Sequence, residues 1–202
     1  DRVGEAIADA LMAPAADRPT VAVLFVDLDA FRQVNEQFGL SVGDAVLPIV
    51  GARLREAVAP AGVLARYGGD EFTVLLADVD PESIEQIARR ARRAVEAGLF
   101  VGERELRLSI TVGIATAHLD DDPIDTPDTL VRNAETAMLM AKQRNAPQEY
   151  FDPSMRARLI ERLRLRQDLE VAVETGGIQP AFQPIVQLET GRPIAVEALA
   201  RW

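Results

Sequence analysis

The sequence predicts a mixed α/β fold in which helices cover the faces of one central sheet. Three kinds of segment lead to this prediction. The continuous apolar run Thr20–Leu28 is typical of a strand that is buried on both faces. Two short apolar runs on either side of paired glycines, Val63–Ala65 and Phe72–Leu76, predict a β-hairpin. Segments with apolar residues at helical spacing lie before and after this hairpin, so strands and helices are expected to pack together.

The elements before the hairpin are expected to be helical apart from the buried strand. Asp1–Met12 has apolar residues at helical intervals, and Pro14 ends that pattern. Phe31–Phe38 predicts a short helix, which Gly39 interrupts. A longer helix is expected over Ser41–Val58, with its apolar face against the sheet.

The elements after the hairpin continue the alternation. Pro81–Ala97 predicts a helix, and Leu99–Phe100 with Leu106–Thr116 predicts a second pair of strands. A helix is expected to run to Lys142, with Asp128 as its N-cap, and Gln148–Phe151 predicts a short edge strand. Periodicity does not fix the order of these strands across the sheet.

The composition excludes several classes of function. The formal net charge of −10 argues against bulk binding of nucleic acid, which needs a basic surface. The chain has no cysteine, which excludes disulfides and thiolate chemistry and suits a cytoplasmic protein. The longest apolar run, Val21–Val26, is too short to span a membrane. A polyphosphate ligand would need a metal ion and a few placed cations. Lys142 is the only lysine among 22 basic residues, and phosphate binding and chance explain this equally well.

The most informative segment is Arg66-Tyr67-Gly68-Gly69-Asp70-Glu71-Phe72. Paired glycines allow positive φ angles and the close approach of another molecule. The two carboxylates that follow are poor strand formers, although a solvated hairpin tip would also explain them. The segment resembles the motif that names the GGDEF family of diguanylate cyclases. The spacing Asp-x-Asp-x-Phe-Arg-x-x-Asn from Asp27, with Gly43-Asp44 eight residues after its asparagine, is also similar to that family. The resemblance implies a palm-like, mostly antiparallel sheet with flanking helices, similar to nucleotide cyclases.

The resemblance also implies a reaction and a set of site residues. The expected reaction condenses two GTP molecules into cyclic di-GMP and two pyrophosphates, with Mg²⁺ or Mn²⁺, at a homodimer interface. By resemblance, the metal ligands are Asp27, the Leu28 carbonyl, Asp70 and Glu71, and the catalytic residues are Asp70 and Glu71. The expected substrate-binding residues are Phe31, Arg32, Asn35, Asp44, Gly69, Lys142 and Arg144.

Elementary chemistry agrees with several of these roles. Mg²⁺ keeps several waters, so two or three carboxylates suffice to hold it. Asp44 as an acceptor and Asn35 as an amide donor would satisfy guanine but not adenine. Asp29 is expected to cap the helix that begins at Phe31, and not to bind metal.

Some residues depart from the family pattern. Leu40 and Leu139 stand where the family usually has a histidine and an aromatic residue, and the segment after Lys142 is shortened. These departures leave an alternative open, in which the domain binds GTP and regulates an adjacent EAL domain without turnover. The intact acidic residues favour the enzyme.

The C-terminal part of the chain has a different character. Asp152–Thr175 predicts a long helix that Gly176-Gly177 ends. The segments Gln183-Pro184-Ile185-Val186 and Glu197-Ala198-Leu199-Ala200-Arg201-Trp202 resemble the opening strands of an EAL domain, a cyclic di-GMP phosphodiesterase, with Glu197 as one metal ligand. We therefore expect a GGDEF domain over residues 1–151 without its usual start, a connecting helix over 152–176, and the first strands of a truncated EAL domain over 177–202. The full-length protein is expected to add the rest of that domain and an upstream sensory domain.

Overall fold

The structure is a computed structural model that describes residues 20–117 and 126–202 of the chain. The helix expected over residues 1–12 lies outside the described residues. The chain divides into two compact units, Asp1–Met155 and Arg156–Trp202.

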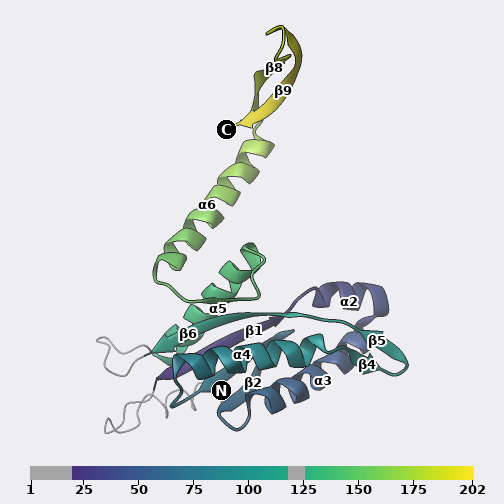
Figure 1. Cartoon of the computed structure of the whole chain (residues 1–202), viewed down its shortest axis with the longest axis vertical. Helices are drawn as coiled ribbons and strands as arrows, with labels where there is room; N and C mark the ends of the chain where they lie inside the picture. Colours follow the sequence, from purple (N-terminus) through teal and green to yellow (C-terminus); the bar gives the residue numbers. More distant parts are fainter. Residues whose placement is uncertain (1–19, 118–125) are drawn as a thin grey trace. The chain divides into compact units, whose positions relative to one another are not determined.

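Five strands form the central sheet of the first unit (Figure 1). All neighbouring strands are antiparallel except β6 and β7, which are parallel. The predicted mixed fold with a mostly antiparallel sheet is therefore confirmed, and β7 is the short edge strand that the sequence predicted. The order across the sheet is β2 (Gly62–Gly68), β3 (Glu71–Leu76), β1 (Val21–Leu28), β6 (Ile110–Ala117) and β7 (Gln148–Tyr150).

Strand β1 lies at the centre of the sheet, and helices cover both of its faces. Because successive side chains of a strand point to opposite faces, its even-numbered and odd-numbered residues enter different cores. Leu24 and Val26 pack with residues of α3 (Leu40–Val58) and α4 (Pro81–Glu96). Phe25 packs with residues of α5 (Pro127–Gln143) on the other face. The run of eight buried residues thus reflects a three-layer arrangement, with β1 in the middle layer.

Helix α5 approaches the sheet closely because β6 carries a glycine beneath it. A Cβ atom on Gly113 would lie 2.0 Å from the carbonyl oxygen of Ala134. Any side chain there would push the helix away from the sheet. Gly113 therefore sets how close α5 lies to β6, and with it the position of Lys142 near the end of α5.

Two helix caps differ from the prediction. Helix α2 (Phe31–Phe38) has Ala30 at its N-cap position and no side-chain cap, so the predicted capping role of Asp29 is wrong. Helix α5 is capped by Thr126, which accepts a hydrogen bond from the amide of Thr129 at 3.2 Å. Pro127 takes the first helical position, where its missing N–H costs nothing. Asp128 therefore falls inside the first turn instead of capping it.

The predicted strand pair between residues 99 and 116 is in fact three strands. β4 (Leu99–Val101) and β5 (Arg104–Leu106) form a separate two-stranded sheet, and β6 starts at Ile110 and joins the central sheet. The sequence suggested one long strand because the alternation of apolar residues continues from Leu106 through Leu108 to Ile110. Periodicity shows which side chains are buried, but it does not show which strand they pair with.

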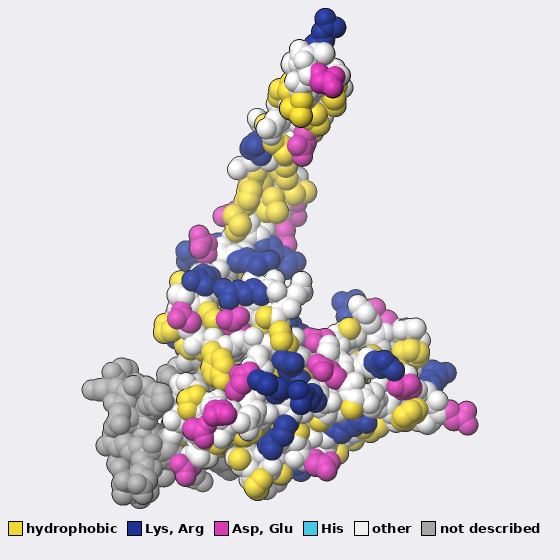
Figure 2. Space-filling view, viewed as in Figure 1, with side chains coloured by type: hydrophobic (Ala, Val, Ile, Leu, Met, Phe, Trp, Pro, Cys, Tyr) yellow, Lys and Arg dark blue, Asp and Glu magenta, His cyan; other side chains and the backbone are white. Residues whose placement is uncertain are grey.

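The second unit consists of a helix and a hairpin. Helix α6 (Ser154–Glu174) ends as predicted at Gly176, which has a φ of 70°. Strands β8 (Gln179–Val186) and β9 (Pro193–Arg201) are antiparallel. Figure 2 shows hydrophobic side chains exposed along this unit. Among the described residues, no helix is long and apolar enough to cross a membrane. The exposed apolar residues of the unit include Ile160, Leu163, Val173, Phe182, Leu188, Ile194 and Val196.

Candidate active site at the end of β1

The end of β1 and the start of β3 bring distant acidic residues together. In the antiparallel pairing of these strands, Asp27 lies opposite Glu71. The amide of Leu28 donates a hydrogen bond to the carbonyl oxygen of Asp70 at 3.3 Å, which ties the hairpin turn to the end of β1. The two acidic segments expected to meet at one edge of the sheet do so in the structure.

The hairpin turn leaves the glycine main chain open. Gly69 has a φ of 50°, a conformation that side chains disfavour. A Cβ on Gly68 or Gly69 would meet nothing within 4 Å. The Arg66 guanidinium donates two hydrogen bonds, at 2.9 and 2.6 Å, to the Gly69 carbonyl oxygen. Arg66 therefore holds the turn while space remains beside the glycines for another molecule.

Negative charge exceeds positive charge around Asp27 and Glu71. Lys142 forms an ion pair with Asp27, whose side chain is largely buried. Burial nevertheless raises the pKa of Asp27, against the pull of Lys142. Burial also raises the pKa of Glu71, and repulsion from Asp27, Glu135 and Asp70 adds to this. Because several carboxylates surround the ammonium group of Lys142, the binding of a further cation here is favourable.

The donor atoms at this edge fit a hard divalent cation. The side chains of Asp27, Asp70 and Glu71 and the carbonyl of Leu28 all offer oxygen, which Mg²⁺ and Mn²⁺ prefer. In the described part of the chain, no three acidic, histidine or cysteine side chains already form a metal-binding cluster. Because Mg²⁺ retains several waters, the opposed pair Asp27 and Glu71 with one carbonyl is a sufficient start for a site.

Helices α2 and α3 bring Asn35 against Gly43, the residue that precedes Asp44. A Cβ on Gly43 would lie 1.9 Å from Asn35 Oδ1 and 3.2 Å from the tip of the Phe31 ring. The Asn35 side chain therefore lies against the main chain of Gly43, next to the exposed Asp44. Phe31 is buried and supports this contact, so a contact between Phe31 and a substrate would come through its main chain.

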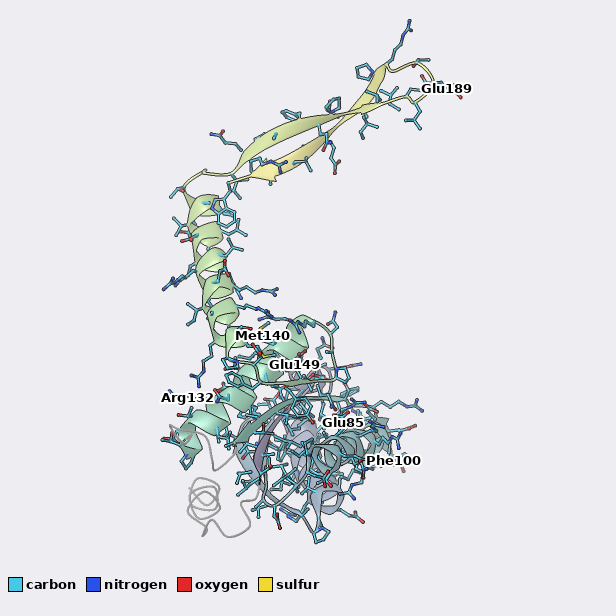
Figure 3. The ribbon with its side chains drawn as sticks, turned by 60° about the vertical axis from the view of Figure 1, so that its left-hand side comes forward. Glu85, Phe100, Arg132, Met140, Glu149 and Glu189 are labelled. Carbon is cyan, nitrogen blue, oxygen red and sulfur yellow. The ribbon has the colours of Figure 1, made fainter. Side chains whose placement is uncertain are left out.

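Three other expected site residues have different surroundings. Arg32 is exposed and pairs with Glu36, with 2.7 Å between Nε and Oε1. Arg144 pairs with Glu149 of β7 at 3.2 Å, and Figure 3 labels this glutamate. Glu197 is exposed on β9 and belongs to the second unit. Among the ion pairs of the described residues, Arg32 and Arg144 are paired with these glutamates and not with Asp27, Asp70 or Glu71.

Sequence reasoning missed a polar cluster beside the acidic residues. The Asp29 carboxylate accepts hydrogen bonds from Ser109 Oγ and Thr111 Oγ1, each at 2.7 Å. These partners are about 80 positions away in the sequence, and only the pairing of β1 with β6 brings them together. The contact between Gly43 and Asn35 was missed as well. The only sequence signal for it was the Gly-Asp pair at positions 43 and 44.

A cleft of ≈ 500 Å³ lies beside this cluster. It is bounded by the start of β6, the end of α5 and the segment that follows it. A larger hollow of ≈ 820 Å³ runs along α6 alone, but one side of a single helix cannot enclose a ligand, so we do not regard it as a site. The smaller cleft is lined by Asp29, Glu96, Ser109, Ile110, Thr111, Lys142, Asn145, Ala146 and Pro147.

Curated relatives resemble the whole chain but are much longer. The bifunctional diguanylate cyclase/cyclic di-GMP phosphodiesterase MucR of Pseudomonas aeruginosa is 35% identical over 203 residues, which is 100% of this chain and 29% of MucR. The cyclic di-GMP phosphodiesterase PdeR of Escherichia coli K12 is 34% identical over 188 residues, 93% of this chain and 28% of PdeR. The chain thus spans less than a third of the length of these relatives.

Solved structures resemble the first unit. The GGDEF domain of YfiN (TpbB) from Pseudomonas aeruginosa superposes with a TM-score of 0.68 and 30% identity, over 74% of this chain and 92% of that domain. This likeness confirms the palm-like fold. The model of the diguanylate cyclase GGDEF domain matches residues 3–148. The match covers more than half of the chain and includes every acidic residue of the candidate site in the first unit. The chain therefore belongs to the GGDEF family.

Proposed function

We propose that the protein is a diguanylate cyclase, which condenses two GTP molecules into cyclic di-GMP and two pyrophosphates. In each half of the reaction, a 3′-hydroxyl attacks an α-phosphate and pyrophosphate leaves. The observation that carries this proposal is the register that sets Asp27 opposite Glu71, beside a glycine turn with free space. Phosphoryl transfer depends mainly on positioning and charge neutralisation, and this edge of the sheet offers groups for both.

In this proposal the acidic residues hold Mg²⁺ or Mn²⁺ and Lys142 supplies a further cation for phosphate. Asp27, Asp70, Glu71 and the Leu28 carbonyl are the proposed ligands, and a bound ion would neutralise phosphate charge. Glu71 serves as a ligand or, through a water molecule, accepts the proton of the 3′-hydroxyl.

The cations outside this group have weaker support as phosphate contacts. Arg32 is exposed near the start of α2 and would have to exchange its partner Glu36 for phosphate. Arg144 would have to release Glu149. Exposed ion pairs of this kind are weak, so neither exchange is costly.

Asn35 and Asp44 are the proposed guanine-binding residues. The Asp44 carboxylate would accept hydrogen bonds from the ring N1–H and the amino group, and the Asn35 amide would donate to O6. Adenine presents the opposite pattern at these positions and would leave both side chains unsatisfied. The contact between Asn35 and Gly43 supports the proposal, because it orders Asn35 against the residue that precedes Asp44.

The reaction needs two nucleotides, whereas the proposed site contains one pair of guanine-binding residues. We propose that a homodimer joins two such sites face to face, so that each copy provides one GTP. GTP is the proposed substrate, and a GTP-consuming protein without cysteine is expected in the cytoplasm.

The second unit fits a role as part of an EAL domain. We propose that residues 1–151 form the GGDEF domain, 152–176 the connecting helix, and 177–202 the first strands of an EAL domain. The exposed apolar side chains of the β8–β9 hairpin support this proposal, because such surfaces are usually covered by further structure. Glu197 would be a metal ligand of that domain, and an upstream sensory domain is proposed for the whole protein.

Two substitutions test the proposed function. Asp70→Asn removes a metal ligand and should lower the rate of cyclic di-GMP formation roughly 100-fold or more. Asp44→Ala should lower the preference for GTP over ATP roughly 100-fold, as measured by competition binding. Wild-type synthesis by Asp70→Asn in Mg²⁺ would contradict the proposed chemistry. GTP binding that is lost in Asp44→Ala, with no product from the wild-type protein, would instead support a regulatory GTP-binding module.

A further inference from the structure

Asp29 lies two residues after Asp27, but its carboxylate makes different contacts. We propose that Asp29 is a positioning residue that clamps the turn between β1 and α2 onto β6. In this role it fixes the Leu28 carbonyl and the first residues of α2, and it does not itself bind the metal ion. The proposal rests on the proposed function of the site as a whole.

The clamp consists of three hydrogen bonds to β6 and to Ser109, the residue just before it. Ser109 Oγ donates to Asp29 Oδ2 and Thr111 Oγ1 donates to Asp29 Oδ1, both at 2.7 Å. The Asp29 amide donates to the Ser109 carbonyl oxygen at 2.9 Å. Thr111 is only 5% exposed, so its hydroxyl has little access to water as an alternative partner. Each oxygen of the carboxylate is thus bound by a hydroxyl of β6 or of the residue just before it.

The turn is also held from its other side. The Leu28 amide donates to the Asp70 carbonyl oxygen at 3.3 Å, so Leu28 is tied to the hairpin turn and Asp29 to β6. The next residue, Ala30, has a φ of 57°, in the left-handed region that alanine rarely adopts. Such a conformation persists only where the surrounding structure imposes it. The contacts on both sides of the turn supply that constraint.

The same contacts argue against a role for Asp29 as a metal ligand. A ligand must direct a free lone pair at the ion, and the neighbouring Asp27 carboxylate is in contact with Lys142 instead of with hydroxyl donors. Asp29 is held on two hydroxyls, and turning it toward an ion would break both bonds. Groups that orient a metal site in this way typically change metal affinity 10- to 100-fold when they are removed.

A comparison of asparagine and alanine at position 29 distinguishes a clamp from a ligand. The amide of Asp29→Asn can accept a hydrogen bond from one hydroxyl and donate to the other, because a hydroxyl can rotate to accept. This variant loses the charge but keeps the clamp. Asp29→Ala loses both. The double variant Ser109→Ala/Thr111→Val keeps the charge and loses the donors.

The measurement is the affinity for Mn²⁺ without nucleotide, by electron paramagnetic resonance on the purified chain, with Asp27→Asn as the reference for a lost ligand. We expect Asp29→Asn to stay within about twofold of the wild type, and Asp29→Ala and the double variant each to lose about tenfold. Loss in Asp29→Asn as large as in Asp27→Asn would overturn the clamp in favour of a ligand. Unchanged affinity in the double variant would overturn it as well.

Turnover separates this inference from the proposed function. If Asp29→Asn keeps the wild-type rate of cyclic di-GMP formation and Asp29→Ala does not, the clamp acts on catalysis. If the Mn²⁺ pattern is as expected but the wild-type protein makes no product, the clamp stands and the proposed function fails. If product forms but Asp29→Asn behaves like Asp27→Asn, the proposed function stands and the clamp fails. Circular dichroism shows whether each variant folds. If Asp29→Ala does not fold, the folded Asp29→Asn variant serves as the reference.

Discussion

Gly43 leaves open the space that the side-chain oxygen of Asn35 occupies, since a Cβ at position 43 would lie 1.9 Å from Asn35 Oδ1. The two residues come from consecutive helices, α2 and α3. The absence of a side chain at one position therefore orders the side chain at the other. This relationship connects the packing of the two helices to the proposed recognition of guanine.

Gly43→Ala should weaken the binding of GTP about tenfold without unfolding the protein. The severe clash is with the end of a flexible side chain, so Asn35 can turn away, and the Phe31 ring, 3.2 Å from the Cβ, needs only a small shift. Isothermal titration calorimetry with GTP and circular dichroism would measure the two effects. Gly51→Ala on the same helix is the control, because its Cβ would meet only Phe72 at 3.4 Å and it should leave GTP affinity unchanged. Equal GTP affinity in Gly43→Ala and the wild type would contradict the role of Asn35.

Lys142→Gln should change metal and nucleotide affinity in opposite directions. Without the ammonium, Asp27 loses its ion-pair partner, so Mn²⁺ alone should bind about tenfold more tightly. GTP should bind less tightly, because a proposed phosphate contact is lost. Arg132→Gln removes the same charge from the same helix and serves as the control (Figure 3). A variant in which both affinities fall together would show that Lys142 supports the fold of the site and does not compete with the metal ion.

Glu71→Gln should raise the melting temperature at neutral pH in the absence of divalent metal. The folded protein raises the pKa of Glu71 above its ordinary value of 4.5, so it holds this proton more tightly than the unfolded chain does. The stability due to Glu71 is therefore full below pH 4.5 and is lost as pH rises through the folded pKa. The advantage of the variant should vanish as the pH falls toward that value.

Melting curves recorded across this pH range are the measurement for Glu71. Glu103→Gln, at the exposed turn between β4 and β5, removes the same charge from a position away from the site and should change little. A melting temperature for Glu71→Gln below that of the wild type at neutral pH would show that Glu71 stabilises the fold.

The fold could be predicted from the sequence to a large extent because its signals are local. Preferences of neighbouring residues predicted the buried strand β1 and the glycine turn before Asp70. They also predicted the end of α6 at Gly176. The partner of each strand could not be predicted in this way. For this reason the segment between Leu99 and Thr116 was expected to form two strands but forms three.

For the candidate site, the sequence pointed to individual residues but not to the contacts that they make. The spacing of motifs pointed to Asp27, Asn35 and Glu71, and the register of β1 with β3 places two of them opposite each other. The contacts of Asp29 could not be predicted, because Thr111 lies on β6, Ser109 lies just before it, and both are about 80 positions away in the sequence. A carboxylate just before a helix usually caps it, and here two hydroxyls compete successfully for the same oxygens.

The most direct test of the central claim is cyclic di-GMP formation as a function of protein concentration, with GTP and Mg²⁺ or Mn²⁺ and detection by mass spectrometry. Because one proposed site positions one GTP, the rate per protomer should rise with protein concentration. A coiled coil fused to the N-terminus should raise the rate at low concentration by holding two copies together. Tight GTP binding with no product from this forced dimer, in either metal, would contradict the cyclase and leave a GTP-binding regulatory module.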